Sequence, residues 1–242
     1  MTVTSSQSGF LLLDKPVGPT SFRMVQLVKR ILRIKKVGHA GTLDPFASGL
    51  LILCVGREAT RRISLLMEGE KEYEATLRLG VETDTQDGTG TVTACREVGE
   101  MRDEEVASCL QSFVGEQLQT PPIFSALKHE GKPLYYYARK GMAVTKAARL
   151  IQIHQIALLS RQRDELCIRV VCGKGTYIRS LAADIGTKLG CGAHLTELRR
   201  TRSGPFSVEN ALPGGCLLGD SEEALPVVLD SLRPVDEIVA GC

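Results

Sequence analysis

The sequence predicts an α/β fold, because strand patterns and helix patterns alternate along its 242 residues. Residues 71–79 alternate between apolar and polar side chains, as a half-buried strand does. Residues 22–34 and 178–189 instead repeat apolar side chains at helical spacing, and the uninterrupted apolar run 50–55 predicts a buried strand. A chain of this length can form one large domain or two small ones and can bury a substantial core.

The remaining elements follow from local apolar spacing and from the residues that start and stop helices and turns. In chain order we expect a strand at 9–13, a helix at 22–34 capped by Ser21, a strand at 50–55, a helix from about Arg57 to Gly69, a strand at 71–79, a loop at 81–90, a strand at 91–95, a helix at 103–113, strands at 151–159 and 166–172, and a helix capped by Thr176 that ends at Gly190.

The composition excludes several classes of protein. Apolar residues make up 43% and charged residues 24%, as in ordinary soluble globular proteins. The longest apolar run, Leu50–Val55, is far too short to span a bilayer, and Met1–Ser8 lacks the basic residues of a secretory signal. The eight cysteines contain no Cys-x-x-Cys pair and the four histidines are dispersed. We therefore expect a cytoplasmic protein with reduced thiols, no metal site and no membrane association.

The charge is unevenly distributed. Residues 209–242 hold seven acids against Arg233, a net charge of −6, which leaves +8 on residues 1–208 because the whole chain carries +2. A basic body is compatible with a polyanionic partner. Residues 128–149 hold six Lys/Arg against Glu130, beside the three adjacent tyrosines 135–137. We interpret this segment as an RNA-binding element that combines phosphate contacts with stacking, although a plain basic hairpin has the same composition.

Residues Gly38–Gly49 form a glycine-punctuated loop that leads into the buried strand 50–55. Pro45 fixes its own φ and pushes Asp44 toward an extended conformation. Asp44 is therefore a carboxylate on a stiff turn beside the core, where a rigid scaffold can present a catalytic group. The spacing alone equally allows the simpler interpretation that the Asp-Pro pair only starts a turn.

The sequence from Gly38-His39-Ala40-Gly41 through Thr42-Leu43-Asp44-Pro45 resembles the catalytic motif of the TruB-type tRNA pseudouridine-55 synthases. Further segments resemble the same family in the same order, namely Asp14-Lys15-Pro16 with Thr20-Ser21, Lys71-Glu72-Tyr73 with Arg78-Leu79-Gly80, Lys174-Gly175-Thr176-Tyr177-Ile178-Arg179, and Ala193-His194-Leu195 with Leu198-Arg199-Arg200. Together these segments cover about residues 9–212.

The resemblance implies a pseudouridine-synthase fold, with a mixed, largely antiparallel central sheet, flanking helices and a central active-site cleft. It implies a catalytic domain at 9–212 that includes an RNA-gripping insertion at about 119–149. Residues 213–242 would then be a short acidic C-terminal extension without the complete PUA domain that many bacterial relatives carry.

The resemblance also assigns roles to individual residues. Asp44 is the essential carboxylate, Arg179 pairs with it, and Tyr73 stacks on the target base. The remaining substrate-binding positions are Lys15 and Pro16 near the cleft, His39 in the gap left in the RNA, Tyr177 at the mouth of a helix, and Leu198 beneath the base. Arginine is unfavourable at the positive N-terminal end of a helix, so Arg179 needs a counter-charge there, and Asp44 is the candidate.

The implied reaction converts uridine 55 in the T loop of tRNA to pseudouridine. The enzyme breaks the N1–C1′ bond of a flipped-out uridine, rotates the base and joins C5 to C1′. This isomerisation involves no redox or phosphoryl-transfer step, so no cofactor is expected. Asp44 either forms a covalent bond with the nucleoside or removes a ribose proton, and the sequence does not choose between these roles. The expected partner is the T-arm stem-loop of tRNA, bound by a monomer without an obligatory protein partner.

Three other functions remain open from the residues alone. A retaining glycosidase or nucleoside hydrolase would need a second carboxylate, and Asp14, Asp84 and Asp184 are available but lie in no pairing motif. A non-catalytic RNA chaperone would explain the basic body but not an Asp-Pro turn matched to a distant arginine. An enzyme steered by a guide RNA within a complex is the third, and the basic segment 119–149 argues for stand-alone binding instead.

Overall fold

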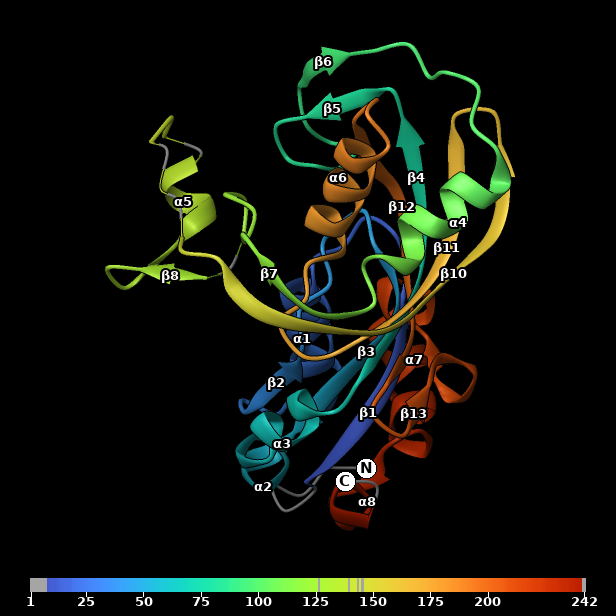
Figure 1. The fold of residues 1–242 in the computed structure, drawn as a ribbon. Helices are drawn as coiled ribbons and strands as arrows, with labels where there is room; N and C mark the ends of the chain where they lie inside the picture. Colours follow the sequence, from blue (N-terminus) through green and yellow to red (C-terminus); the bar gives the residue numbers. More distant parts are fainter. Residues whose placement is uncertain (1–7, 126, 139, 143, 145, 241–242) are drawn as a thin grey trace. The chain divides into compact units, whose positions relative to one another are not determined.

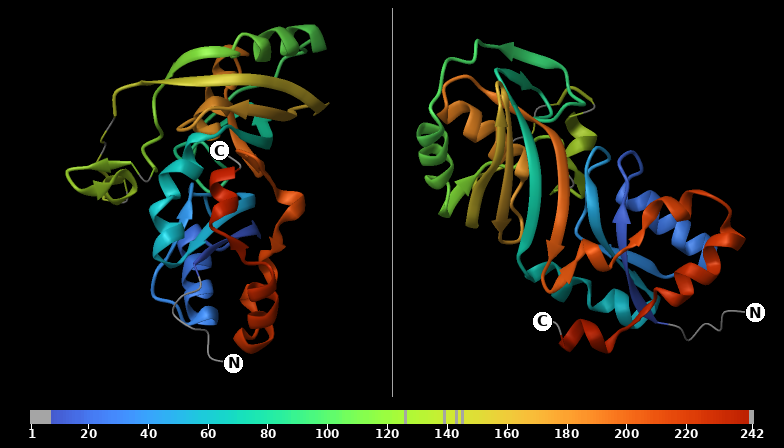
Figure 2. Two further views of the ribbon diagram at one scale, coloured as in Figure 1. Left: turned by 90° about the horizontal axis from the view of Figure 1, so that it is seen from below. Right: turned by 90° about the vertical axis from the view of Figure 1, so that its right-hand side faces the viewer.

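The computed structural model describes residues 8–125, 127–138, 140–142, 144 and 146–240. Most of the N-terminal stretch Met1–Ser8 and four positions of the expected insertion 119–149, including Arg139, lie outside these residues. The chain forms two compact units, the first from Met1–Tyr73 with Leu198–Cys242 and the second from Glu74–Glu197. Figure 1 follows the chain through both, and Figure 2 gives two further views.

The first unit contains a set of paired strands around β1 and β3, in the order β14-β1-β3-β12. Its elements are β1 (Gly9–Lys15), α1 (Ser21–Leu32), β2 (Val37–Ala40), β3 (Ser48–Val55), α2 (Gly56–Arg61), α3 (Ile63–Glu68), β13 (Phe206–Ser207), η1 (Val208–Asn210), β14 (Leu212–Pro213), η2 (Gly214–Leu218), α7 (Ser221–Asp230), β15 (Arg233–Pro234) and α8 (Asp236–Ala240). Strand β3 pairs antiparallel with β1 and β2, whereas β12 (Ala193–Ser203) pairs with β3 in parallel.

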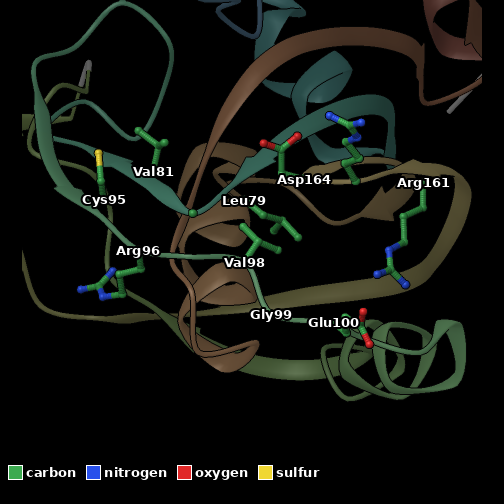
Figure 3. Close-up of a pocket in the computed structure, with 11 residues that line it drawn as sticks. Leu79, Val81, Cys95, Arg96, Val98, Gly99, Glu100, Arg161 and Asp164 are labelled. Carbon is green, nitrogen blue, oxygen red and sulfur yellow. The ribbon is translucent and has the colours of Figure 1, made fainter.

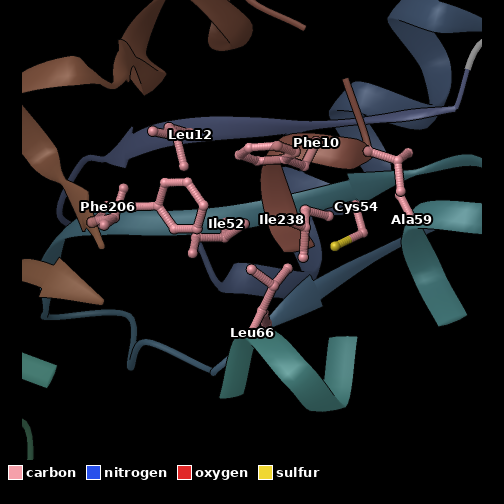
Figure 4. Close-up of a cluster of buried hydrophobic side chains, with 11 residues drawn as sticks. Phe10, Leu12, Ile52, Cys54, Ala59, Leu66, Phe206 and Ile238 are labelled. Atoms are coloured by element: carbon pink, nitrogen blue, oxygen red, sulfur yellow. The ribbon is translucent and has the colours of Figure 1, made fainter. Parts of the chain in front are cut away.

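The core of the first unit lies where side chains of β1 and β3 meet residues from the end of the chain (Figure 4). The rings of Phe10 and Phe206 pack 5.2 Å apart between centroids and are tilted by 59°. Ile238 of α8 and Leu66 of α3 are also buried in this cluster. The expected buried strand 50–55 is confirmed, because every residue from Leu50 to Val55 is fully buried within β3.

The second unit contains the antiparallel hairpin of β10 and β11, seen as the long yellow and orange strands of Figure 1. The strand order is β4-β11-β10-β7. Its elements are β5 (Val81–Thr83), β6 (Val92–Cys95), α4 (Asp103–Gln111), β7 (Gly115–Gln119), β8 (Lys128–His129), β9 (Lys132–Pro133), α5 (Leu134–Ala138), β10 (Arg149–Gln162), β11 (Glu165–Cys172) and α6 (Ile178–Lys188). Strands β4 (Lys71–Leu79) and β12 have residues in both units.

The fold class is confirmed, because the structure is a mixed α/β fold with mostly antiparallel pairings. The alternation in 71–79 is also correct, since Ala75, Leu77 and Leu79 are buried while the intervening side chains are more exposed. Two expected helix caps are wrong. Thr20 caps α1 by accepting the Arg23 N–H, which leaves the Ser21 hydroxyl for another role, and α6 begins after Tyr177 without a side-chain cap.

Two further expectations need correction. The helix expected from Arg57 to Gly69 is two short helices, α2 and α3, which meet at Arg62. The loop expected at 81–90 starts with the short strand β5, which pairs with β6. Both differences arise because single short segments carry too little periodic signal to fix where an element breaks.

Gly49 provides a direct test of the packing of β3 against β12. Its φ is +100°, and a Cβ atom there would lie 2.3 Å from the carbonyl oxygen of Arg200. We expect Gly49→Ala to lower the free energy of unfolding by at least about 2 kcal/mol, because it adds backbone strain to a steric clash. Urea unfolding measures this loss. Gly215→Ala, where a Cβ meets nothing within 4 Å, is the matched control and should change stability little.

Candidate active site

The Asp44 turn is fixed to the scaffold by backbone hydrogen bonds on both sides of the carboxylate. The Ser21 hydroxyl at the start of α1 donates to the Leu43 carbonyl at 3.0 Å and accepts the Leu43 N–H at 2.9 Å. After the turn, the N–H of Ala47 donates to the Asp44 carbonyl at 3.1 Å, and that of Gly18 to the Pro45 carbonyl at 2.8 Å. The half-buried Asp44 is thus held on a rigid turn, as the sequence predicts.

Two buried cations lie beside this turn. Lys15, at the end of β1, is fully buried, and its Nζ donates to the carbonyls of Pro16 at 2.8 Å and Pro19 at 2.9 Å. Arg200 of β12 is 2% exposed and donates to the carbonyls of Leu50 at 2.7 Å and Gly41 at 3.2 Å. Burial lowers the pKa of Lys15 from 10.5 to about 8, although the Asp44 carboxylate opposes this change.

Lys15 therefore predicts a particular pH dependence of stability. The folded protein releases the Lys15 proton near pH 8, whereas the unfolded chain holds it to about pH 10.5. Because the unfolded state binds more protons between these values, the free energy of unfolding should rise with pH there, by at most about 1.4 kcal/mol per unit. Urea unfolding of the wild type and of Lys15→Met across this window measures the effect. Equal pH slopes in the two proteins would contradict it.

His39 lies in β2, opposite Leu53 of β3. Burial and, to a smaller extent, the nearby charge of Arg200 lower its pKa below the usual 6.5. Its Nδ1 is buried and has no hydrogen-bond partner among the described residues. The neutral imidazole is therefore the form that this environment favours near pH 7.

The other predicted residues of the first unit lie on or next to its strands. Pro16 follows β1, Tyr73 lies half-buried in β4, and Leu198 is buried in β12. The structure adds a neighbouring pair that sequence reasoning missed. The Arg199 guanidinium donates to both carboxylate oxygens of Asp14, at 3.0 and 2.7 Å. This pair engages one of the carboxylates that a glycosidase would need.

Arg179 lies in the first turn of α6, in the second unit, and is 4% exposed. Its guanidinium donates to the carbonyls of Thr85 at 3.0 Å and Phe124 at 2.8 Å. It also lies 3.4 Å from a carboxylate oxygen of Asp87, which is equally buried. The structure therefore provides a counter-charge for Arg179 within its own unit, which resolves the conflict with the helix N-terminus. The expected pairing of Arg179 with Asp44 connects the two units and stays a prediction.

Asp87 is a residue that sequence reasoning missed. Its carboxylate accepts hydrogen bonds from the Thr85 hydroxyl at 2.8 Å and the Thr89 N–H at 3.0 Å, besides facing Arg179. A buried carboxylate with several donors is a costly arrangement that needs its cation. The spacing Thr85-x-Asp87-x-Thr89 was the available signal, but it resembles an ordinary polar turn.

Tyr177 precedes α6 and is fixed by Gln119, the last residue of β7. The Gln119 side chain accepts the Tyr177 N–H at 2.8 Å and donates to its carbonyl at 3.0 Å. The Arg149 guanidinium lies 5.0 Å from the centroid of the Tyr177 ring. Gln119 is 3% exposed, so this reciprocal pair holds the start of the helix that carries Arg179.

A separate pocket in the second unit has a volume of about 570 Å³ (Figure 3). It contains none of the predicted site residues, and three of its five charged lining groups are already paired: Arg96 with Glu82, Arg161 with Asp103, and Asp164 with Arg78. Within the described ranges, no group of His, Cys, Asp and Glu is arranged to hold a metal ion. No helix in this part of the chain is long and apolar enough to cross a membrane.

Two family models match this chain. The TruB family pseudouridylate synthase model (N-terminal domain) matches residues 29–178, and that of the tRNA pseudouridylate synthase B C-terminal domain matches residues 179–240. The tRNA pseudouridine synthase B of Desulfotalea psychrophila is 60% identical over 210 residues, which are 85% of each chain. That of Aromatoleum aromaticum is 51% identical over 96% of this chain and 73% of its own.

Solved structures agree with these matches. A chain of the archaeal box H/ACA sRNP Nop10-Cbf5 complex is 30% identical, with a TM-score of 0.70 over 96% of this chain and 61% of its own. A chain of a Cbf5-Nop10-Gar1 complex is 32% identical, with a TM-score of 0.72 and the same coverage. The protein thus spans about three-fifths of the length of these structural relatives. The ordered motifs, the family models and the identity to curated relatives lead to one conclusion: the chain belongs to the TruB family of pseudouridylate synthases.

Proposed function

We propose that this protein is a tRNA pseudouridine(55) synthase that isomerises uridine 55 in the T-arm stem-loop. The observation that carries the proposal is the Asp44 turn, which is bonded on both sides and has the Lys15 ammonium beside it. A carboxylate near a buried cation is stabilised in its charged form. Asp44 then acts on the ribose of a flipped-out uridine, as nucleophile or as base.

The neighbours of Asp44 in the first unit bind the extruded nucleotide. Tyr73, half-buried near the start of β4, offers an aromatic face for stacking, and Leu198 supplies an apolar contact below the base. His39, whose imidazole is neutral, fills the space that the base leaves in the RNA. Lys15 and Pro16 hold the loop next to the Asp44 turn.

We propose that two residues of the second unit, Arg179 and Tyr177, also take part in the reaction. Arg179 is held by Asp87 and two carbonyls, so its guanidinium is fixed before substrate arrives. We propose that it also orients Asp44 in the complex with RNA, because a planar fork can serve two acceptors at once. Such preorganisation places charge where the transition state needs it.

The segment at 119–149 grips the RNA. Tyr136 lies between Lys132 and Lys140, with each Nζ 4.6 Å from the ring centroid, and the two lysines lower its pKa. These two exposed lysines beside a half-buried ring suit phosphates next to unstacked bases. The substrate implies a cytoplasmic enzyme. We propose that it acts as a monomer without a protein partner and without a cofactor.

The test is to incubate the purified protein with a complete set of unmodified tRNAs and to map pseudouridine by sequencing. The expected product is pseudouridine at position 55 alone, with no free uracil released. Conversion at other positions but not at 55 would contradict the substrate assignment. Free uracil would instead favour the nucleoside hydrolase.

The similarity to Cbf5 chains favours one second candidate, an enzyme that acts on RNA only within an assembly. Those solved structures contain additional proteins, and a further similar structure is that of an H/ACA RNP bound to a substrate RNA. The identity to the tRNA pseudouridine synthase B of Desulfotalea psychrophila is much higher, 60% against 30–32%. Activity of the isolated chain on tRNA supports the first candidate, and activity that requires added proteins supports the second.

A further inference from the structure

Helix α1 and the turn that follows it concentrate positive charge. Between Lys15 and Leu43 the sequence contains no acidic residue. The same stretch holds a group of six cations, namely Arg23, Lys29, Arg30, Arg33, Lys35 and Lys36. Lysine and arginine near the end of α1 are favoured by the helix dipole, but the dipole acts only on the last turn. It therefore does not account for Arg23 or for the cations after the helix.

Five of these cations are exposed and Lys29 is half-buried, and the described residues provide none of the six with a counter-charge. Arg23 and Arg30 are exposed, and their spacing of seven residues places them on one face of α1, while the exposed Arg33 is the left-handed residue that ends the helix. No carboxylate of a described residue forms an ion pair with any of the six. Some arginines of the same unit do have carboxylate partners, as Arg199 has Asp14 and Arg202 has Glu70. Helix α7 carries acidic residues and packs beside α1 (Figure 2), but its acids, all among the described residues, form no ion pair with the six cations.

The basic surface continues onto α2. The N–H of Gly56 donates to the Lys36 carbonyl at 2.8 Å, which places the start of α2 next to the turn after α1. Arg57 and Arg61 of α2 are exposed, and neither forms an ion pair with a described residue. We call the exposed cations of α1, of the turn 33–36 and of α2 the α1–α2 basic surface.

This surface has a fixed position relative to Asp44. Ser21, the first residue of α1, is the one whose hydroxyl holds the Leu43 backbone. The 12 residues of α1 then run for about 18 Å, so its last cations lie well away from the reacting ribose. A nucleic acid held at Asp44 would therefore meet these cations with phosphates that are remote from the target nucleotide.

We propose that the α1–α2 basic surface is a second phosphate-binding surface for the tRNA substrate, separate from the catalytic turn and from the segment 119–149. This inference rests on the proposed function, since it assumes a tRNA as the polyanion. Unpaired, exposed cations bind phosphates by releasing counterions, which makes affinity depend steeply on salt. An anionic membrane is the other polyanion that a basic helix can bind. However, the apolar face of α1 is buried in the core, so little remains to insert into lipid.

The test measures the affinity for full-length tRNA between about 50 and 200 mM salt. The variant combines Arg30→Gln, Arg33→Gln and Lys35→Gln. Its dissociation constant should rise at least about tenfold at low salt. The plot of the logarithm of the association constant against the logarithm of the salt concentration has a negative slope, which should become shallower by about 2. The rate at saturating tRNA should stay at the wild-type value. Arg30→Lys with Arg33→Lys should keep the wild-type slope.

The matched control removes three paired arginines instead, Arg78→Gln, Arg169→Gln and Arg233→Gln, for the same change of net charge. Its salt slope should stay close to that of the wild type. Equal losses in both variants, or a wild-type slope in the α1 variant, would overturn the inference. So would loss of binding to phosphatidylserine vesicles with unchanged tRNA affinity. Because these are binding measurements, they remain decisive even if position 55 is not modified, which would overturn the proposed function separately.

Discussion

Asp44→Asn should abolish pseudouridine formation while leaving tRNA binding within about twofold of the wild type. The carboxylate is the only group proposed to act on the ribose, and removing such a group typically costs at least about 10⁴-fold in rate. The turn itself should survive, because its hydrogen bonds to Ser21, Ala47 and Gly18 use backbone atoms rather than the Asp44 carboxylate. Single-turnover assays with saturating tRNA isolate the chemical step.

The control for Asp44→Asn is Asp230→Asn, which removes an exposed carboxylate at the end of α7 in the same unit. It should retain full activity. A second readout concerns Lys15, whose pKa the Asp44 carboxylate raises. In Asp44→Asn the attraction between the Asp44 carboxylate and the Lys15 ammonium is lost, so the pKa of Lys15 should fall below about 8. Activity of Asp44→Asn within tenfold of the wild type would remove the basis of the proposed mechanism.

Arg179→Lys should slow the chemical step by about 10²–10³-fold, the range found when one preorganised electrostatic group is lost. The Arg179 guanidinium serves the Thr85 carbonyl, the Phe124 carbonyl and Asp87 at the same time. An ammonium is a single point charge and cannot reproduce this planar fork. At least one buried carbonyl would lose its donor, which also lowers the free energy of unfolding by about 1–3 kcal/mol.

A structural loss and a catalytic loss can be separated in this variant. Rates are measured well below its melting temperature, where the protein remains folded, and at saturating tRNA. Arg169→Lys is the control, because Arg169 forms an exposed pair with Glu74 whose loss should cost less than about 1 kcal/mol. If Arg179→Lys is destabilised but reacts within fivefold of the wild-type rate, Arg179 has only a structural role.

The parts of the fold with a clear local period could be predicted from the sequence. The alternation in 71–79 and the apolar run 50–55 correspond to β4 and β3, and the apolar spacing after Phe22 corresponds to α1. Strand β12 was not predicted, because arginines occupy three of its last five positions. One of them, Arg200, is nearly fully buried, and only the fold supplies its carbonyl partners Leu50 and Gly41.

Only the site residues that lie within a sequence motif could be predicted. Asp44 and Arg179 came from ordered motifs, and their local settings, a bonded turn and a helix start, agree with the sequence interpretation. Asp87 and Gln119 were missed, because their partners Arg179 and Tyr177 are 92 and 58 residues further along the chain. No local pattern encodes such contacts. A carboxylate or an amide is also common in surface turns, so the residue type alone gives no signal.

The anchoring of α6 has a consequence for how the segment 119–149, which we propose binds RNA, can be altered. Gln119 holds Tyr177, the Thr120 carbonyl accepts the Ser180 hydroxyl, and the Phe124 carbonyl accepts Arg179. Residues 119–124, the first part of this segment, therefore help to hold Arg179 and the start of α6 in place. Deletion from residue 120 onward should therefore reduce both the catalytic rate and RNA binding. Deletion that begins after Ser125 should reduce RNA binding alone. Among related proteins, differences in the length of this segment should therefore occur after Ser125 and not in residues 119–124.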